Sequence, residues 1–489
     1  MQLMSMLPVI LILIPLVAAF LISRSGSTPN LREFWTFSAG ILNVFLLFKM
    51  VPWILEGNVY SLTLCQILPD VSLFIKVDSF GMLFAFIASS LWILTSLYSI
   101  GYMRSLKEHA QTRYFLFFAV AISATLGVAF SGNLLTMYMF YELLSLSTFP
   151  LVTHHQDQEA RKGGRTYLTY LLGTSIGFAL PAIIITYAMT GTLAFDSAGI
   201  LPSSLSAAGG LGLLLLFLFG FSKAGLMPFH SWLPGAMVAP TPVSALLHAV
   251  AVVKVGVFCL LRIITGVFGV DLLSQTQLST VICVISGITV IVSSLIALSQ
   301  DNLKRRLAFS TIGQLSYIVL GAGLASKMGV VGSMSHIGMH AFGKITLFFC
   351  AGAIYVATGK KYISQMRGIG KKMPFTMLAF FLGALSVTGI PFTGGMISKW
   401  YMLLGTMEAD KAWVLVIYLV STLLNAAYFF PIVYNAFFCR EKDALFKGRM
   451  KEAPLPALLP PLVTAVSCVL LFFFPSSLFD FARVMGALL

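Results

Sequence analysis

The stretch FGFSKAGLMPFHSW, residues 219–232, lies inside an apolar run, 209–236, that is long enough to cross a membrane. It nevertheless contains Lys223, whose charge is costly to bury in hydrocarbon. It also contains Pro228, which lacks the amide proton that a continuous helix uses. Freed backbone groups are tolerated at membrane depth only where protein or water satisfies them. The stretch therefore predicts a broken membrane helix beside a polar cavity.

Apolar runs of similar length recur from end to end of the chain. Of its 489 residues 58% are apolar and 10% are charged, and its mean hydropathy is +0.93, values typical of an integral membrane protein. A run of about 20 apolar residues spans a hydrocarbon core of roughly 30 Å. The predicted fold class is an all-α polytopic membrane protein with about fourteen transmembrane helices, at 4–23, 34–55, 78–101, 113–131, 133–153, 164–190, 209–236, 241–266, 277–299, 303–324, 328–358, 373–406, 412–438 and 454–475.

The distribution of basic residues predicts the orientation of the chain. Alternate connections, beginning with the first, carry 21 of the 31 Lys and Arg residues, and the connections on the other side carry six. Because the richer side is cytoplasmic, both termini are predicted to lie on the outer side of a prokaryotic cell (inner) membrane. The first run has no basic start and no small-residue cleavage site, so we interpret it as a retained helix. The net charge of +14 thus reflects membrane orientation and not nucleic-acid binding.

The sequence offers no site for a redox cofactor or a metal ion. The six cysteines show no CxxC pair and no ligand spacing, so neither an iron–sulfur cluster nor a zinc site is predicted. The connections are too short for a soluble nucleotide-binding domain, and the GIG at 368–370 forms no phosphate loop. We therefore expect no cofactor in this chain, and any redox chemistry would belong to a partner.

Several ionisable residues fall at membrane depth, where burying a charge is costly, so the presence of each one calls for a structural or functional explanation. Glu142 is the only acid near the middle of a predicted span, and Lys254 and His248 lie in the span 241–266. We interpret Glu142, Lys223 and Lys254 as parts of an ion route, the alternative being structural ion pairs. His248 is a weaker candidate, since a histidine can merely bond a neighbouring helix. His154 and His155, in a basic connection, are expected to be exposed to solvent.

Two further segments place titratable groups at the same depth. In SHIGMHAFGKITLFF, His336, His340 and Lys344 recur every four residues and so share one helix face. Such a row suits proton hopping, because histidine changes charge near neutral pH; interhelical bonding is the alternative. The span 373–406 is too long for one crossing and contains TGIPFTGGMISKW, which predicts a second break just before Lys399.

Two broken helices, five spans apart and each with a central lysine, indicate an internal repeat. The lysine precedes the proline in the first and follows it in the second, which suits inverted units. We therefore predict inverted five-helix repeats from spans 4 to 8 and 9 to 13, with helices 7 and 12 broken. The expected parts are three N-terminal helices (1–101), a first ion half-channel (113–266), a second half-channel (277–438) and a C-terminal helix with its tail (454–489).

At these motifs the sequence resembles the antiporter-like, proton-translocating subunits of respiratory complex I, membrane-bound hydrogenases and Mrp-type cation/proton antiporters. The resemblance rests on FYELLSL around Glu142, the segment from Ser222 to Ala249 around Lys223, the HxxxHAFxK row ending at Lys344, and GIPFTGG before Lys399. It implies fourteen helices, two inverted repeats and a central hydrophilic axis. It also implies a complex with other membrane subunits, including further antiporter-like ones, in the lipid bilayer.

The resulting functional hypothesis is translocation of H⁺ or Na⁺ as part of a redox-driven pump. A charge pair of Glu142 and Lys223 would control the lysine's proton affinity, since burial disfavours the charged form and a carboxylate favours it. The proton would pass to Lys254, then His336, His340 and Lys344, and finally Lys399; the resemblance implies this order. The alternatives are an Mrp-type antiporter without a redox partner and an inert membrane anchor.

Overall fold

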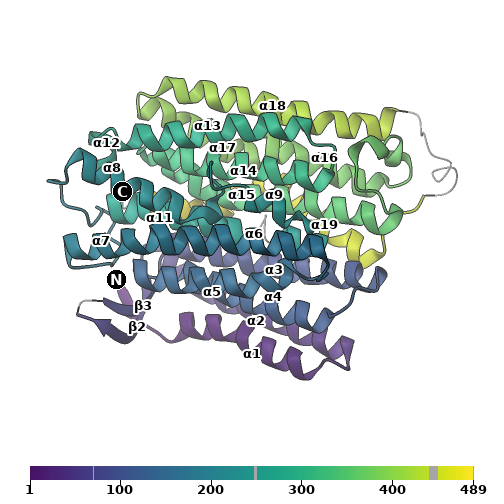
Figure 1. The fold of residues 1–489 in the computed structure, drawn as a ribbon, viewed down its shortest axis with the longest axis horizontal. Helices are drawn as coiled ribbons and strands as arrows, with labels where there is room; N and C mark the ends of the chain where they lie inside the picture. Colours follow the sequence, from purple (N-terminus) through teal and green to yellow (C-terminus); the bar gives the residue numbers. More distant parts are fainter. Residues whose placement is uncertain (70, 247–249, 440–449, 488–489) are drawn as a thin grey trace.

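Long apolar helices lying side by side make up most of the computed structural model, which describes residues 1–69, 71–246, 250–439 and 450–487 (Figure 1). The first part of the chain forms three of them. These are α1 (Leu7–Arg24), α2 (Pro29–Leu55) and α3 (Ser79–Ser105). In Figure 1 α1 and α2 form the edge of the bundle opposite to α18.

The next part of the chain contains the first predicted unit. Its elements are α4 (Gln111–Ala129), α5 (Leu134–Val152), α6 (Gln158–Thr174), α7 (Leu180–Thr190), α8 (Ala207–Gly220), α9 (Trp232–Gly235), α10 (Thr241–Ala245), α11 (Val252–Ile263) and α12 (Val270–Gln275). A π-helical turn, Ser175–Ala179, joins α6 to α7 without a break in the rod. α10 and α11 are not one continuous helix, because Ala251 has a non-helical backbone with ψ of −81°.

The remaining elements complete the bundle. They are α13 (Leu278–Ser299), α14 (Leu303–Gly323), α15 (Lys327–Thr358), α16 (Pro374–Thr388), α17 (Gly394–Glu408), α18 (Ala412–Phe438), α19 (Leu455–Phe473) and α20 (Ser476–Gly486). α15 lies at the centre, packed against α3, α10, α14, α16, α17, α19 and α20. Helices that line the centre are more buried than the outer ones: 72% of the apolar window of α15 is buried, against 33% for α18.

The structure confirms the polytopic all-α class. Helices occupy all fourteen predicted positions, and within the described residues ten helices are long and apolar enough to cross a membrane unbroken. The spans 209–236, 241–266 and 373–406 are divided into shorter pieces, as predicted for the first and third only. The remaining predicted span, 303–324, forms the single helix α14, which is too polar to count among the ten. It has three basic residues in its first turn and carries polar side chains on its inner face.

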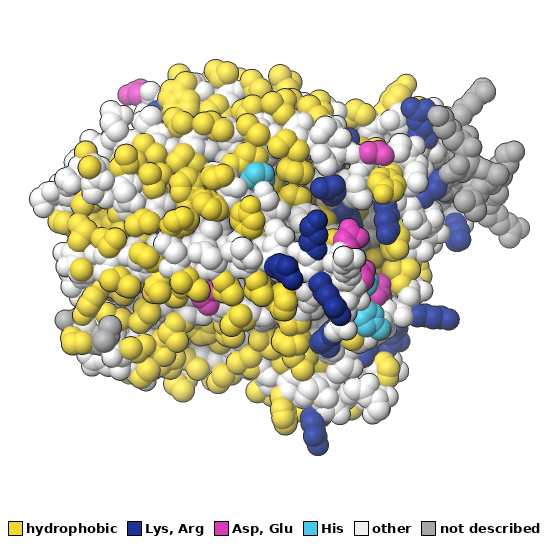
Figure 2. Space-filling view, in the orientation of Figure 1, with side chains coloured by type: hydrophobic (Ala, Val, Ile, Leu, Met, Phe, Trp, Pro, Cys, Tyr) yellow, Lys and Arg dark blue, Asp and Glu magenta, His cyan; other side chains and the backbone are white. Residues whose placement is uncertain are grey.

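A small sheet, absent from the sequence prediction, lies at one corner of the bundle (Figure 1). β1 (Gln2–Met4) pairs in parallel with β2 (Val59–Leu68), which pairs antiparallel with β3 (Val71–Val77) through Tyr60 opposite Val77. β2 and β3 are rich in β-branched and aromatic residues, which favour strands. Both termini lie at this end (Figure 1), whereas Lys and Arg side chains gather at the other end (Figure 2).

A buried ion pair ties the N-terminal helices to the first predicted unit. Asp78 caps α3, accepting from the Gly81 amide at 2.8 Å, and its carboxylate receives two bonds of 2.5 Å from Arg262 near the end of α11. The orientation prediction counted Arg262 among the six basic residues of the connections on the poorer side, but the residue is buried among Phe80, Phe195 and Phe258. The segment around it continues α11 in a π-helical turn, Ile264–Phe268, and so remains inside the bundle.

Replacing Arg262 by leucine should destabilise the protein, because Asp78 would keep a buried charge without its partner. Removing one member of such a pair costs about 3–5 kcal/mol. Thermal unfolding of the detergent-solubilised protein measures this. The double variant Asp78→Asn, Arg262→Leu serves as the control and should recover part of the loss. A single variant as stable as the parent protein would contradict the prediction.

Candidate functional site

The first predicted break lies at Lys223. α8 ends at Gly220, the residues Ser222–Ala224 form a single 3₁₀ turn, and Gly225 follows with φ of +72°, a left-handed conformation that favours glycine. Polar groups of other segments satisfy the freed backbone. The indole of Trp232 donates to the Ser222 carbonyl at 3.1 Å, and the Met227 amide donates to the Thr289 hydroxyl at 3.2 Å. The predicted interruption of helix 7 is confirmed.

The side chain of Lys223 is held by α5. It is fully buried, and its ammonium donates to the Tyr141 carbonyl at 2.8 Å and to the Ser145 hydroxyl at 2.7 Å. The same nitrogen lies over the Tyr141 ring, 3.0 Å from its centroid. The Tyr141 hydroxyl in turn accepts from the Lys223 amide at 3.2 Å. Two neutral acceptors and one aromatic face thus surround the cation.

Glu142 follows Tyr141 on α5 but makes no ion pair with Lys223 in this structure. Successive side chains of a helix point about 100° apart. The rotation of α5 that directs Tyr141 toward the lysine therefore directs Glu142 elsewhere. Both carboxylate oxygens are shielded from solvent and have no hydrogen-bond partner among the described residues. The structure thus shows no direct contact between the two members of the predicted charge pair.

Lys254, on α11, meets His340, on α15. Both side chains are buried, and the lysine Nζ is hydrogen-bonded to the histidine Nδ1. When the lysine is charged it must donate, so Nδ1 then accepts and Nε2 carries the ring proton. That Nε2 is buried without a partner among the described residues. This contact joins the first predicted unit to the second.

The row on α15 continues from His340 to His336. The two rings lie nearly parallel, with centroids 5.8 Å apart, as the spacing of four residues predicts. His336 bonds through Nδ1 to the Ser398 hydroxyl at 2.8 Å and through Nε2 to the Gln314 side-chain oxygen at 3.1 Å. Its ring also stacks beside Tyr317, at 6.3 Å between centroids. Both ring nitrogens are thus engaged by neighbouring helices.

Lys399 lies beyond the second break, which is confirmed between α16 and α17. Gly389 ends α16 with φ of +88°, and Lys399 reaches back from α17. Its ammonium donates to the carbonyls of Val387 and Thr388, each at 2.9 Å, and lies 4.6 Å from the centre of the Tyr317 ring. Free carbonyls at a helix C-terminus carry partial negative charge, so they favour a cation there.

The side chain of Lys344 points away from the two histidines, toward α14. Its ammonium donates to the Ser310 hydroxyl on α14 at 2.8 Å, which is bonded to the Tyr428 hydroxyl on α18 at 2.9 Å. The Tyr428 carbonyl accepts from Arg306, one of the basic residues that begin α14. The expected order placed Lys344 between the histidines and Lys399. In the structure His336 is the neighbour of Lys399, and Lys344 forms a side branch.

Lys223 and Lys254 are close in the fold but are joined by packing only. No hydrogen bond among the described residues links their side chains. Gly256, half a turn after Lys254, faces the turn that carries Lys223, and a Cβ there would overlap the backbone of Lys223 and Ala224. His248, the remaining predicted site residue, lies outside the described residues.

Exchanging Gly256 for alanine should push α11 away from the Lys223 turn. Overpacking of this kind costs about 1–3 kcal/mol, and it would also disturb the alignment of Lys254 with His340. The thermal unfolding temperature and the translocation rate should both fall. Gly212→Ala is the matched control, because a Cβ at that helical position meets nothing within 4 Å. Equal behaviour of the two variants would contradict the assigned contact.

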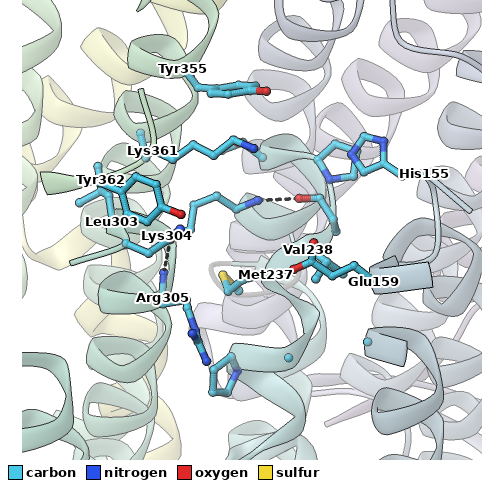
Figure 3. A pocket seen from close by; sticks show the side chains of 18 of the residues that line it. His155, Glu159, Met237, Val238, Leu303, Lys304, Arg305, Tyr355, Lys361 and Tyr362 are labelled. Atoms are coloured by element: carbon cyan, nitrogen blue, oxygen red, sulfur yellow. Dashed lines mark hydrogen bonds between the residues drawn. The ribbon is translucent and has the colours of Figure 1, made fainter. Parts of the chain in front are cut away.

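A cavity that the sequence did not reveal opens at the basic end. It has a volume of about 570 Å³, and residues from α6, α9, α14 and α15 contribute to its lining. In Figure 3 Lys304 and Lys361 extend from one wall toward the wall that carries His155 and Glu159. Lys304 donates to the Ala239 carbonyl at 2.6 Å. The cavity thus lies at the end of the bundle where Lys and Arg side chains gather (Figure 2).

His154, next to this cavity, was expected to be exposed, and this expectation was wrong. The side chain is fully buried, because the connection after α5 folds back under the start of α4, where Arg113 donates to the His154 carbonyl at 2.9 Å. Burial lowers the pKa of His154 to about 3, and the charges of His109, His155 and Arg113 act in the same direction. His155 is only half-buried.

Comparisons with known proteins identify similar chains over nearly the whole length. The profile of the family described as "NADH:quinone oxidoreductase/Mrp antiporter, TM" matches residues 131–425. NADH-quinone oxidoreductase subunit N of Desulforudis audaxviator is 32% identical, over 92% of this chain and 89% of that protein. A putative antiporter subunit of Staphylococcus saprophyticus is 31% identical over 92% of this chain, which spans only 58% of that protein. A chain in the Mrp complex of a Dietzia species shares the fold, with a TM-score of 0.87 at 21% identity over 99% of this chain and 96% of that one.

Proposed function

Since the chain belongs to the NADH:quinone oxidoreductase/Mrp antiporter family of membrane subunits, we propose that it translocates protons as one subunit of a redox-driven, complex I-like or membrane-bound hydrogenase-like pump. Na⁺ remains the alternative ion. The buried titratable groups described at membrane depth are mainly the nitrogens of lysine and histidine, which carry protons and, when charged, repel metal cations. This favours the proton.

The observation that carries the proposal is the continuous row from Lys254 through His340 and His336 to Lys399. Each member is buried at a cost that purely structural packing would avoid, and each lies within contact of the next or of a shared polar neighbour. Lysine and histidine can both accept and release a proton near neutral pH when their surroundings change. The row therefore supports a relay and not an inert anchor.

The geometry also suggests how the relay is loaded and emptied. Lys223 is held by neutral groups, so moving the Glu142 charge toward or away from it would change its proton affinity. Lys254 and His340 can share a proton directly through their contact. Lys344, through Ser310 and Tyr428, reaches toward the basic end and provides a second connection to that side. Lys399 would exchange its proton with the outer side.

Glu142→Gln should slow translocation without loss of assembly. The amide keeps the size of the carboxyl group but removes the charge that tunes Lys223, so a fall on the order of 10–100-fold is expected. Proton uptake into vesicles that contain the whole complex measures the rate. Glu56→Gln, at the exposed end of α2, is the control and should be neutral. Normal translocation by Glu142→Gln would argue against the loading step.

Partner identity tests the redox-driven form of the proposal. The complex should be purified through a tag on this subunit and its chains identified by mass spectrometry. Iron–sulfur, hydrogenase-like or quinone-site subunits are expected. Only small membrane subunits, together with Na⁺-driven proton movement in vesicles, would favour the second candidate, Mrp-type antiport, which the likeness to the antiporter chains supports.

The proposed placement of the chain is a prokaryotic cell (inner) membrane with both termini outside. It rests on the separation of the termini from the basic end (Figures 1 and 2). Cysteine labelling of intact cells tests it. In a chain whose exposed Cys65 has been replaced by serine, a cysteine introduced at the exposed Met1 should react with an impermeant reagent, and one introduced at exposed Lys162 should not.

A further inference from the structure

Four titratable side chains from two connections meet at the basic end, apart from the row described above. Glu108 and His109 lie between α3 and α4, and His154 and His155 lie just after α5. One ligand atom from each of Glu108, His109 and His154 falls within 4.8 Å of the other two. His155 adds a fourth nitrogen, its Nδ1 lying 3.6 Å from a Glu108 carboxylate oxygen.

His154 is the member that packing alone leaves unexplained. It is fully buried, yet neither ring nitrogen has a hydrogen-bond partner among the described residues. Buried polar side chains are nearly always satisfied, so two bare nitrogens on one ring point to a missing ligand. Its Nε2 lies 3.9 Å from the same Glu108 oxygen that faces His155. Its ring also lies 4.8 Å from that of His109, between centroids.

The spacing of these atoms suits a small tetrahedral cation. Ligands at about 2.0–2.1 Å from a tetrahedral zinc ion lie about 3.3 Å apart. The Glu108–His155 and Glu108–His154 separations of 3.6 and 3.9 Å exceed this by about 0.3 and 0.6 Å. The ligand atoms of Glu108, His109 and His154 lie up to 4.8 Å apart, so the exposed His109 ring and the Glu108 side chain would rotate toward the ion. Imidazole nitrogens with one carboxylate favour Zn²⁺ over Ca²⁺ or Mg²⁺, which prefer oxygen ligands alone. Glu108 also offsets part of the charge that a cation would add at this basic end.

We propose that Glu108, His109 and His154, with His155 as the fourth ligand, bind one Zn²⁺ ion. The ion would tie the α3–α4 connection to the α5–α6 connection. Glu108 and His155 also line the cavity of Figure 3, so the site is reached from the aqueous side and its occupancy would brace one wall of that cavity. Arg113, through its bond to the His154 carbonyl, positions the buried ligand. The proposal does not depend on which ion the subunit translocates.

The test is zinc binding by the intact purified complex, carrying a tag that contains no histidine. After dialysis against buffered Zn²⁺, elemental analysis should find one additional zinc per chain compared with a complex that contains the His109→Ala variant. Glu108→Gln should also bind on the order of 100-fold more weakly, since loss of even an outer-shell partner costs about 10–100-fold. Zn²⁺ should raise the unfolding temperature of the parent chain but not of the His109→Ala and Glu108→Gln chains.

His230→Ala is the matched control, since His230 is a half-buried histidine outside this cluster, and it should bind zinc as the parent does. His154→Ala should lose binding as well. Should that buried change impair folding, the exposed His109 and the partly exposed Glu108 still decide the outcome, because their substitution leaves the packing intact. Equal zinc content and affinity in the parent, His109→Ala and Glu108→Gln chains would overturn the site.

Discussion

Replacing Lys399 by alanine is expected to lower ion translocation on the order of 100-fold or more while the complex still assembles. Proton transfer through a positioned side chain typically contributes about 10²–10⁴-fold to a rate. Lys399 and His336 both lie against the Tyr317 ring, and Lys399 is the last titratable member of the row. Its removal leaves the proton no acceptor beyond the histidines.

The measurement is proton movement in vesicles containing the assembled complex, with subunit content checked on the same sample. Lys327→Ala is the control, because Lys327 is an exposed lysine at the start of α15 and contacts no member of the row in the described residues. Lys399→Arg separates charge from proton transfer, since arginine keeps the cation at the end of α16 but does not release its proton. An active Lys399→Arg variant would mean that Lys399 serves as a fixed charge.

Lys254→Met should interrupt proton transfer between the two predicted units, and the translocation rate should fall by a factor similar to that expected for Lys399→Ala. Methionine has nearly the same shape as the lysine stem but cannot bond to His340 or carry a proton. Because this contact is the only side-chain bond between α11 and the row on α15 in the described residues, no second donor replaces it. We expect normal assembly and a translocation rate on the order of 1% of the parent rate.

The same vesicle assay applies, with Lys49→Met, at an exposed position on α2, as the control. A second measurement distinguishes a broken relay from a distorted fold. His340→Ala should give the same loss, and the double variant should be no worse than either single variant, because both changes break one contact. Additive losses in the double variant would indicate two independent roles and contradict a shared proton.

The parts of this site that sequence could predict are those set by local rules. Pro391 with its neighbouring glycines predicts the second break, and the spacing of His336, His340 and Lys344 predicts their common face, since both follow from helix geometry. The partners of these groups could not be predicted. Ser398 and Gln314 come from other helices, and which of them meets His336 depends on how the helices pack.

The errors have the same physical origin. Glu142 and Lys223 have the right charges for a pair, but the rotation of α5 presents Tyr141 instead. His154 lies in a polar connection, yet that connection folds inward. Lys344 shares a face with the histidines but extends to Ser310, because a long side chain can lean away from its own row. Composition reports where a segment lies in the membrane, whereas the direction of each side chain is a tertiary property.

Two hydrogen bonds from Lys399 to the last carbonyls of α16 connect α17 to α16, and their strength depends on whether the Lys399 amine is protonated. The charged ammonium holds the negative end of one helix from a position on the next. When the proton leaves, the neutral amine holds those carbonyls less strongly, and the junction loosens. In the proposed relay, the proton occupancy of Lys399 and the stiffness of the junction between α16 and α17 would therefore change together, and a subunit that pulls on either helix would change how readily Lys399 releases its proton.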